Sequence, residues 1–389
     1  MLGHRWRLTI ALFSGLVCNP TLAENGLTER SIVFGQVAAL EGPAGDLGRG
    51  LRQGILAAFQ EANRSARISG NSLSLKSLDD GYEPERTVEA TKRLLDEEKV
   101  FALIGAVGTP TSKAAQPIAT AQKVPFIGPF TGADFLRNPY NRYVVNVRAS
   151  YFEETEAWIE HLTKDLRLSK IAILYQDDAF GLAGLEGVQR AMSKRNMSLV
   201  ASGSFRRNTT AVKTAFLDIA KGQPEAVVMV APYKPVAEFI KLSHQMKLDV
   251  VFIAISFVGS DSLAKELGDQ GAGVIVSQVV PFPWDASLPV VASYQRAMNA
   301  LDPNAKFGFV SLEGYLVGRL AVEALNRIPG EPTRERFLDA IAGTPLEFGG
   351  ITLSYGPSKN QGSDAVYFTA LQADGWFKPI SRLVGASGQ

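Results

Sequence analysis

Short apolar runs alternate along most of this chain with stretches whose apolar residues recur at helical spacing. In 48–63, for example, Leu51 and Ile55 share one face with later apolar residues, which predicts a helix packed on one side. The runs 171–174 and 227–230 are apolar at every position, as is typical of strands covered on both faces. Strands that alternate with helices of about 10–15 residues predict βαβ units and parallel sheets.

The same pattern sets the expected elements. Strands are expected at 31–39, 101–104, 124–127, 170–175, 198–202, 226–230, 250–254 and 273–279. Helices are expected at 48–63, from Pro84 onward, and at 112–122, 153–165, 182–194, 211–221, 235–246, 262–267, 289–300, 310–326 and 334–341. These are too many units for one compact sheet, and no period of 20–50 residues indicates a solenoid. The sequence therefore predicts an α/β protein with two doubly wound lobes.

The two lobes are not expected to be contiguous in sequence. Extended segments at 144–148 and 277–281 are expected to cross between them, with a last crossing near 348–351. The expected division is 24–146 for the first part of lobe I, 147–277 for lobe II, 278–347 for the second part of lobe I, and 348–389 for the C-terminal segment of lobe II and the tail. Several crossings at one waist form a hinge, which permits closure around a ligand.

The first 23 residues have the pattern of a secretory signal peptide. Arg5 and Arg7 precede an apolar run at 8–18, and small residues lead to Ala23. The run is too short for a bilayer, which needs about 20 residues. Cleavage is expected after Ala23, giving a periplasmic protein; the alternative is a buried N-terminal helix.

Cys18 also suggests a lipoprotein site, but Val17 stands where such a site needs a small residue. Cleavage after residue 23 removes this single cysteine, so we expect no disulfide in the exported chain. With 40 basic and 39 acidic residues and no basic block, the composition does not indicate nucleic-acid binding. The spacing G-x-G-x-x-x-G at 48–54 is one residue too long for a dinucleotide loop, and no catalytic or metal-ligand motif appears. We therefore expect no cofactor, no metal and no enzymatic activity.

Five segments, in order and spacing, carry a resemblance to a known family. They are 35–44, 78–84, 104–109, 124–129 and 175–181. Together they resemble the branched-chain amino-acid binding-protein family, the type I periplasmic solute-binding proteins of ABC importers. The resemblance implies a two-lobed fold with a multi-strand hinge, a monomer that binds an amino acid or related organic acid, and a membrane permease as partner. The alternatives are a subunit that presents its ligand to a membrane sensor or chemoreceptor, and, third, an enzyme on this fold.

Loops that follow the strands of lobe I supply the first candidate contacts, because ligands of open α/β sheets bind beyond the carboxyl ends of the strands. Thr109 lies in the segment 105–112, where a strand turns into a helix and free N–H groups suit a carboxylate, and the resemblance implies that its hydroxyl holds one. Thr109 or Thr111 could instead simply cap the helix. The resemblance also implies contacts from Thr131 and Gly132, whose loop could otherwise be a plain turn. Leu47 matches a position that borders the side-chain pocket.

Three aromatic residues of lobe II are the next candidates. Tyr151, Phe180 and Tyr233 lie in predicted loops or at helix starts, where their rings would cover an apolar or flat ligand. Each ring could instead pack at the hinge or rim.

One position departs from the family pattern. Family members that bind α-amino acids have an acidic residue after the strand matching 250–254, and Ser256 stands there. A buried ammonium without a partner is costly, so Asp178 or Glu41 would have to replace the carboxylate, or the ligand has no ammonium. Asp261 is expected only to cap the helix that follows.

Overall fold

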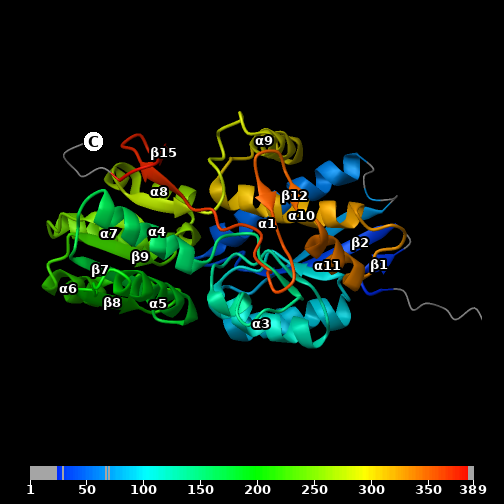
Figure 1. Ribbon diagram of the computed structural model, residues 1–389, viewed down its shortest axis with the longest axis horizontal. Coiled ribbons are helices and arrows are strands. Elements are labelled where there is room, and N and C mark those ends of the chain that lie inside the picture. The colour runs from blue at the N-terminus through cyan, green and yellow to red at the C-terminus, as the bar shows by residue number, and fades with distance from the viewer. Residues whose placement is uncertain (1–23, 29, 66–67, 69–70, 384–389) are drawn as a thin grey trace, which may run out of the picture.

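The chain forms two lobes that lie side by side along the long axis of the molecule (Figure 1). The computed structural model describes residues 24–28, 30–65, 68 and 71–383. The expected signal peptide, with Cys18 and the cleavage position at Ala23, lies outside the described residues. No helix in the described part of the chain combines the length and the apolar character needed to cross a bilayer.

Lobe I contains a six-stranded sheet of order β1-β2-β4-β5-β6, with β3 also paired to β2. Its strands are β1 (Leu27–Thr28), β2 (Ser31–Ala38), β3 (Ser72–Asp79), β4 (Ala102–Ile104), β5 (Phe126–Ile127) and β6 (Val144–Val145), and all except β1 run parallel. Its early helices are α1 (Gly45–Arg64), α2 (Pro84–Lys92), which continues into the π-helical turn η1 (Arg93–Glu97), and α3 (Thr109–Ala121).

Helices from the later chain return to lobe I. They are α9 (Pro289–Leu301), α10 (Phe309–Asn326) and α11 (Arg334–Gly343). Helix α10 crosses α1 closely, because a Cβ atom at Gly54 would lie 1.9 Å from the carbonyl oxygen of Ser311, and one at Gly314 would lie 2.2 Å from that of Leu51. Within the glycine-rich stretch 48–54, Gly54 thus serves helix packing, whereas Gly48 approaches the carbonyl oxygen of Ala39.

Lobe II contains a seven-stranded sheet of order β15-β14-β11-β10-β9-β7-β8. Its strands are β7 (Ile171–Gln176), β8 (Ala201–Phe205), β9 (Ala226–Val230), β10 (Val251–Ala254), β11 (Ile275–Gln278), β14 (Tyr367–Leu371) and β15 (Phe377–Ile380). Its helices are α4 (Tyr151–Lys164), α5 (Ala179–Ser193), α6 (Lys213–Lys221), α7 (Tyr233–Gln245) and α8 (Ser260–Leu267). The sheet is parallel from β8 to β11, and β14 and β15 add to it antiparallel. This confirms the prediction of two doubly wound lobes.

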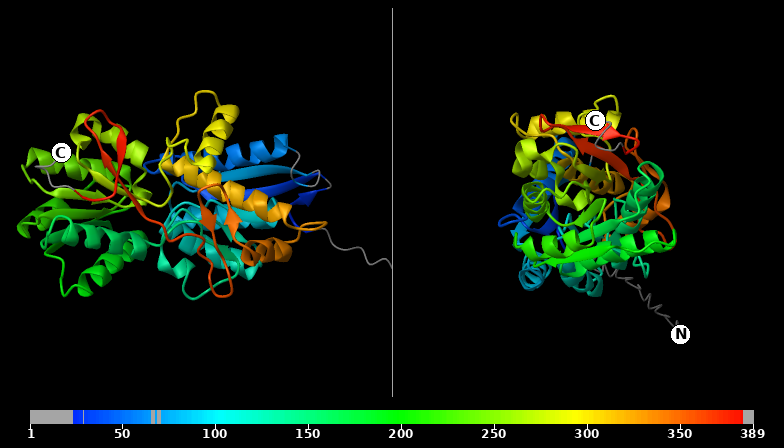
Figure 2. Two further views of the ribbon diagram at one scale, coloured as in Figure 1. Left: turned by 45° about the horizontal axis from the view of Figure 1, so that its top comes forward. Right: turned by 90° about the vertical axis from the view of Figure 1, so that its left-hand side faces the viewer.

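The chain crosses between the lobes at one waist, which the left-hand view of Figure 2 shows. Asn146 bridges to Gln361, so the first and last crossing segments lie side by side. The stretch 348–351, where the last crossing was expected, instead joins β12 (Leu346–Glu347) and β13 (Thr352–Leu353) in a hairpin. The Phe348 ring of this hairpin lies against Arg319 of α10, so the hairpin packs on lobe I and the chain crosses only later.

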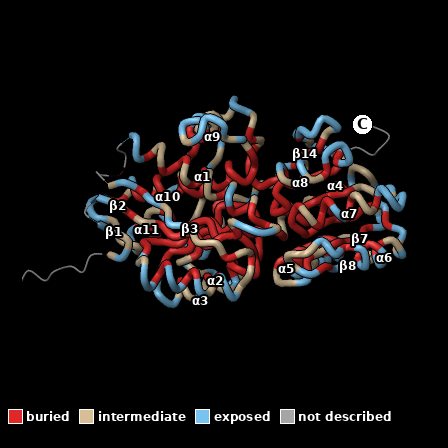
Figure 3. Tube along the Cα trace, turned by 180° about the vertical axis from the view of Figure 1, so that it is seen from behind, coloured by how far each residue is buried: buried red, intermediate tan, exposed pale blue. Residues whose placement is uncertain are grey.

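Buried residues run through both lobes and across the waist (Figure 3). One connected cluster of buried apolar side chains includes Phe34 of β2 in lobe I and Val228 of β9 in lobe II. It also includes Phe257 of the 3-10 turn η3 (Ser256–Val258), which lies where the lobes meet. Two further 3-10 turns are η2 (Asp134–Leu136) and η4 (Gly268–Gly271). The lobes therefore meet through packed side chains, in a closed arrangement.

Candidate ligand-binding site

Two threonine hydroxyls meet at the carboxyl ends of the lobe I strands. Thr109 is the first residue of α3, and Thr131 lies in the loop after β5; their Oγ1 atoms are 2.6 Å apart, and both side chains are buried. No side chain caps α3, whose N-cap is Gly108 with φ +102°. Thr111 donates its hydroxyl to backbone carbonyls, including that of Gly108 at 3.1 Å. The hydroxyl of Thr109 therefore does not cap helix α3.

The phenol of Tyr151 lies beside this hydroxyl pair. Tyr151 begins α4, whose N-cap Ser150 forms a capping box with Glu153. Burial raises the pKa of Tyr151 to about 12, so the phenol is a neutral donor at pH 7. The Thr131 and Thr109 hydroxyls lie near the phenol and lower its pKa in part, but among the described residues the phenol oxygen makes no hydrogen bond of good geometry.

Gly132 fixes the position of Tyr151. The backbone N–H of Tyr151 donates to the Gly132 carbonyl at 2.8 Å, and a Cβ atom at Gly132 would lie 2.6 Å from that nitrogen. Any side chain at this position would push α4 away from the loop. The loop of lobe I and the first helix of lobe II are thus joined through backbone.

Aromatic rings from both lobes surround Phe257 of η3. Its ring centroid lies 4.5 Å from that of Phe180, 5.3 Å from Phe130 and 6.1 Å from Tyr82. The ring of Phe180 also lies 5.6 Å from that of Tyr151. These rings are buried at the contact between the lobes and would give a ligand there an apolar, largely aromatic surrounding.

Leu47 and Tyr233 meet at Gly259 on another side of this contact. A Cβ atom at Gly259, where φ is +77°, would lie 2.5 Å from Leu47 Cδ2 and 3.6 Å from Tyr233 Cδ1. Leu47 belongs to the first turn of α1, and Tyr233 is the first residue of α7. The structure thus brings both predicted residues to the place where the lobes touch.

Ser256 lies in a buried network of charged groups. Glu154 accepts hydrogen bonds from the Ser256 backbone N–H at 3.0 Å, the Ser256 hydroxyl at 2.9 Å and the Ser277 hydroxyl at 2.6 Å. Arg148 donates to the Ser256 hydroxyl at 3.1 Å and binds Glu313 through two hydrogen bonds of 2.7 and 2.8 Å. Burial raises the pKa of Glu154. Burial also disfavours the charge of Arg148, but the Glu313 carboxylate more than offsets this and raises the pKa of Arg148.

The two carboxylates expected as replacements for an acidic residue at Ser256 have other surroundings. Asp178 is the N-cap of α5, where it accepts from the Phe180 N–H at 2.9 Å, and it also accepts from Gln176 and Arg207. The side chain of Glu41 belongs to an exposed residue. Among the hydrogen bonds of the described residues, neither carboxylate contacts Ser256.

Asp261 does not cap the helix that follows it, so that expectation is wrong. Helix α8 starts at Ser260 with Gly259 as its N-cap, and Asp261 falls in the first turn. A Cβ atom at Gly308 would lie 2.0 Å from Asp261 Oδ2, so this carboxyl faces the beginning of α10 in the other lobe.

Most of the chain matches a known family. The model of the periplasmic binding protein family matches residues 31–375. The chain belongs to this family. Its curated relatives include a Leu/Ile/Val-binding protein homolog 7 of Brucella abortus (strain 2308), 21% identical over 340 residues, which cover 84% of each chain.

Solved structures resemble this periplasmic binding protein over nearly its full length. The crystal structure of a possible leucine/isoleucine/valine-binding protein from Rhodopirellula baltica SH 1 is 38% identical, with a TM-score of 0.87, and covers 93% of this chain and 98% of that one. A solute-binding protein from R. palustris, in complex with benzoate, shares the fold at 19% identity, with a TM-score of 0.80 and coverage of 90% and 95%. These likenesses confirm the type I periplasmic binding protein fold.

Several residues at the contact between the lobes of the binding protein were not singled out from the sequence. Phe130 precedes Thr131 in the loop after β5, and Phe257 follows Ser256 in the loop after β10. Their positions in these loops could have identified them as candidate contacts. Tyr82 has φ +63°, which is rare outside glycine, and its hydroxyl accepts from Gln176 of lobe II at 3.3 Å. Glu154 and Arg148 gave no signal, since a charged residue in a helix or crossing segment normally faces solvent.

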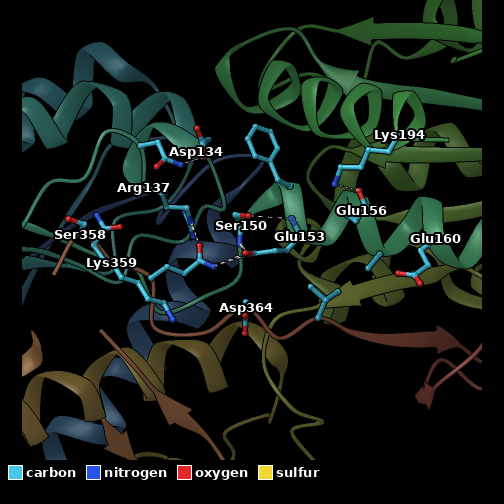
Figure 4. A pocket seen from close by; sticks show the side chains of 16 residues that line it. Asp134, Arg137, Ser150, Glu153, Glu156, Glu160, Lys194, Ser358, Lys359 and Asp364 are labelled. Carbon is cyan, nitrogen blue, oxygen red and sulfur yellow. Dashed lines mark hydrogen bonds and ion pairs between the residues drawn. The ribbon is translucent and has the colours of Figure 1, made fainter. Parts of the chain in front are cut away.

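The hinge of the binding protein has a groove of its own, with a volume of about 650 Å³, shown in Figure 4. Arg137 lies in its wall and donates to Gln361 and to the backbone carbonyls of Ala133 and Arg148, the last two at 3.0 Å. Gln361 in turn donates to Glu153. Burial lowers the pKa of Arg137 to about 10, so it remains charged at pH 7. This chain of contacts ties the crossing segments together.

The described residues show no metal site. No group of three or more His, Cys, Asp or Glu side chains among them is arranged to hold a metal ion. The family consists of binding proteins, and the site is built from hydroxyls, aromatic rings and internally paired charges.

Proposed function

We propose that this protein is the periplasmic binding component of an ABC importer, and that it holds a small organic carboxylate without an α-ammonium group between its lobes. Membership of the periplasmic binding protein family supports the transport role. The ligand contacts proposed are Leu47, Thr109, Thr131, Gly132, Tyr151, Phe180 and Tyr233, joined by Phe257.

The observation that carries the ligand class is the pairing of the carboxylates near Ser256. Glu154 already accepts three hydrogen bonds and lies beside Arg148, and Asp178 accepts three others. An ammonium group in this apolar surrounding would lose its water without gaining a free carboxylate, which is costly. A carboxylate, by contrast, can accept from the unpartnered phenol of Tyr151 and from whichever of the Thr109 and Thr131 hydroxyls does not donate to the other.

The relatives whose names mention leucine, isoleucine and valine suggest an apolar ligand body of similar size. The solved protein bound to benzoate is an example of an aromatic carboxylate held by this fold. Both ligand bodies are apolar, which matches the aromatic surroundings of Phe257.

The experiment compares matched pairs of ligands that differ only in the amino group. Leucine is compared with 4-methylpentanoate, and phenylalanine with 3-phenylpropanoate, by thermal shift and then by calorimetry. We expect the acid of each pair to bind and its amino acid to bind at least tenfold more weakly. Ligand at about 100 times its dissociation constant stabilises the folded state by about 2.7 kcal/mol, which is readily detected. Tighter binding of both amino acids would refute the proposed ligand class.

Native mass spectrometry of freshly purified protein gives an independent check. A retained small molecule that contains a carboxyl group but no primary amine would support the proposal, and a retained amino acid would contradict it.

A further inference from the structure

A second cavity opens on the surface beside α8 and the turn between β14 and β15, and its volume is about 640 Å³. Lobe I contributes Trp284, Lys306 and Phe307, which precede α9 and α10 in the chain. Lobe II contributes Lys265 of α8 and Trp376 of the hairpin turn. Thr109 and Thr131 are not among its lining residues, so the cavity is separate from the proposed ligand site.

Aromatic rings from the two lobes meet edge to face at this cavity. The ring centroids of Trp284 and Trp376 are 5.8 Å apart at 80°, and those of Phe309 and Phe377 are 6.0 Å apart at 88°. Trp376 nevertheless remains 60% exposed. A large indole held on a tight turn, with most of its surface in water, offers a flat apolar face to an aromatic ligand.

The charges in the cavity wall favour an anion. Lys265 and Lys306 contribute two ammonium groups, and Asp261 is the one acidic residue in the wall. The Asp261 carboxyl faces the backbone at the start of α10, beside Gly308 and Phe309. Burial raises the pKa of this carboxyl to about 7, and the N–H groups at the helix end offset only part of that effect. The carboxylate of Asp261 is thus partly compensated by the helix, which leaves the lysines to attract a ligand.

We propose that this cavity is a second binding site, and that it takes a small anion with an aromatic body. A smaller adjoining cavity of about 140 Å³ shares Asp261, Lys306 and Phe307 with it and reaches Leu47 and Gly259, where the lobes touch. Because both lobes build its walls, a ligand here binds to the closed arrangement and favours it. The inference goes beyond the ligand proposed between the lobes and does not depend on it.

The test uses 1-anilinonaphthalene-8-sulfonate, an aromatic anion whose fluorescence rises in apolar sites. The chain expressed from Glu24 contains Trp158, which is fully buried, together with Trp284 and Trp376. We expect saturable binding with energy transfer from tryptophan. Trp376→Ala should weaken binding roughly tenfold, since an aromatic contact of this kind combines buried area with ring stacking.

A double variant, Lys265→Met with Lys306→Met, tests the anionic class. We expect binding that is several-fold weaker and less sensitive to salt. The uncharged N-phenyl-1-naphthylamine should bind the unaltered protein more weakly than the sulfonate does. Equal binding of the two probes, or unchanged affinity in the lysine variant, would overturn the proposed class.

Two controls locate the probe. Tyr367→Ala removes another exposed ring, 42% exposed, from the same hairpin but outside the cavity, and should leave binding unchanged. Thr109→Val alters the site between the lobes and should also leave probe binding unchanged. If Thr109→Val weakens the probe as much as Trp376→Ala does, the probe binds between the lobes and the second site is refuted, whatever the outcome for the ligand pairs above.

Discussion

The Ser256 hydroxyl donates to Glu154 Oε1 at 2.9 Å, deep in the contact between the lobes. The same hydroxyl accepts from Arg148, so it joins two buried groups of opposite charge. The family pattern predicts an acidic ligand contact at position 256. Ser256 stands there instead, and its hydroxyl is already hydrogen-bonded on both sides.

Removing this hydroxyl should reduce stability more than ligand binding. Ser256→Ala leaves Glu154 and Arg148 each without one partner in a buried setting, and we expect the free energy of unfolding to fall by about 1–3 kcal/mol. Affinity for the true ligand should change less than threefold. Urea denaturation and calorimetry measure the two effects, with Ser193→Ala at the exposed end of α5 as the control. A large loss of affinity without loss of stability would make Ser256 a ligand contact after all.

Asp80 should make stability depend on pH. It is fully buried, accepts from the Tyr82 N–H and the Thr87 hydroxyl, and burial raises its pKa from 3.8 to about 6. The folded protein therefore holds this proton more tightly than the unfolded chain. The stability that the proton contributes is complete below about pH 4 and is lost as pH rises through about 6, which amounts to about 3 kcal/mol.

The variant Asp80→Asn isolates this contribution, because the amide cannot ionise. Between pH 4 and pH 7, the unfolding free energy of Asp80→Asn should fall by a few kcal/mol less than that of the unaltered protein. Asp374→Asn, in the exposed hairpin turn, serves as the control. An identical pH dependence in Asp80→Asn and the unaltered protein would mean that Asp80 ionises normally.

The regular layers of the fold were predictable from the sequence because each of their elements carries its own signal. Strand β9 was placed at 226–230 from its unbroken apolar run, and the structure buries every residue in it. Strand β3 was missed, since only one of its eight residues is buried and its polar residues outnumber its apolar ones. The hairpin β12–β13 was mistaken for a crossing because short strands of two residues carry too little pattern to identify.

The candidate site was predictable only where a residue belongs to a loop at the end of a strand. Thr109 and Thr131 come from separate loops of that kind, and the structure brings their hydroxyls together. Arg148 and Glu313 are 165 positions apart in the chain and meet only after both lobes have formed. No local pattern reports such a pair, because the burial that makes it informative is a property of the assembled fold.

Arg207 should hold the lobes closed. It lies after β8 in lobe II and pairs with Glu83 of lobe I at 2.7 Å and with Asp178 at 3.1 Å. Glu83 is partly exposed, so the contribution across the lobes is on the order of 1 kcal/mol, or roughly fivefold in ligand affinity. We expect Arg207→Met to weaken the ligand by about that factor and to increase the radius of gyration measured by small-angle scattering. Lys221→Met, which removes an exposed ion pair within α6, should do neither.

Thr109→Val tests the proposed contact to the ligand carboxylate. Valine keeps the shape of threonine, so the variant removes a hydroxyl from the buried pair with Thr131 without opening a cavity. A hydrogen bond to a charged group contributes about 1.5–3 kcal/mol, so affinity for the acid should fall roughly tenfold to a hundredfold. Thr111→Val is the matched control, because its hydroxyl donates to backbone carbonyls within the first turn of α3. Calorimetry should show that Thr109→Val loses affinity and Thr111→Val does not. A Tyr151→Phe variant should also lose affinity, since the phenol is the remaining unpaired donor beside the threonine pair. If Thr109→Val and Thr111→Val bind the acid equally well, the carboxylate is held elsewhere, and the anion-binding role of the α3 loop is wrong.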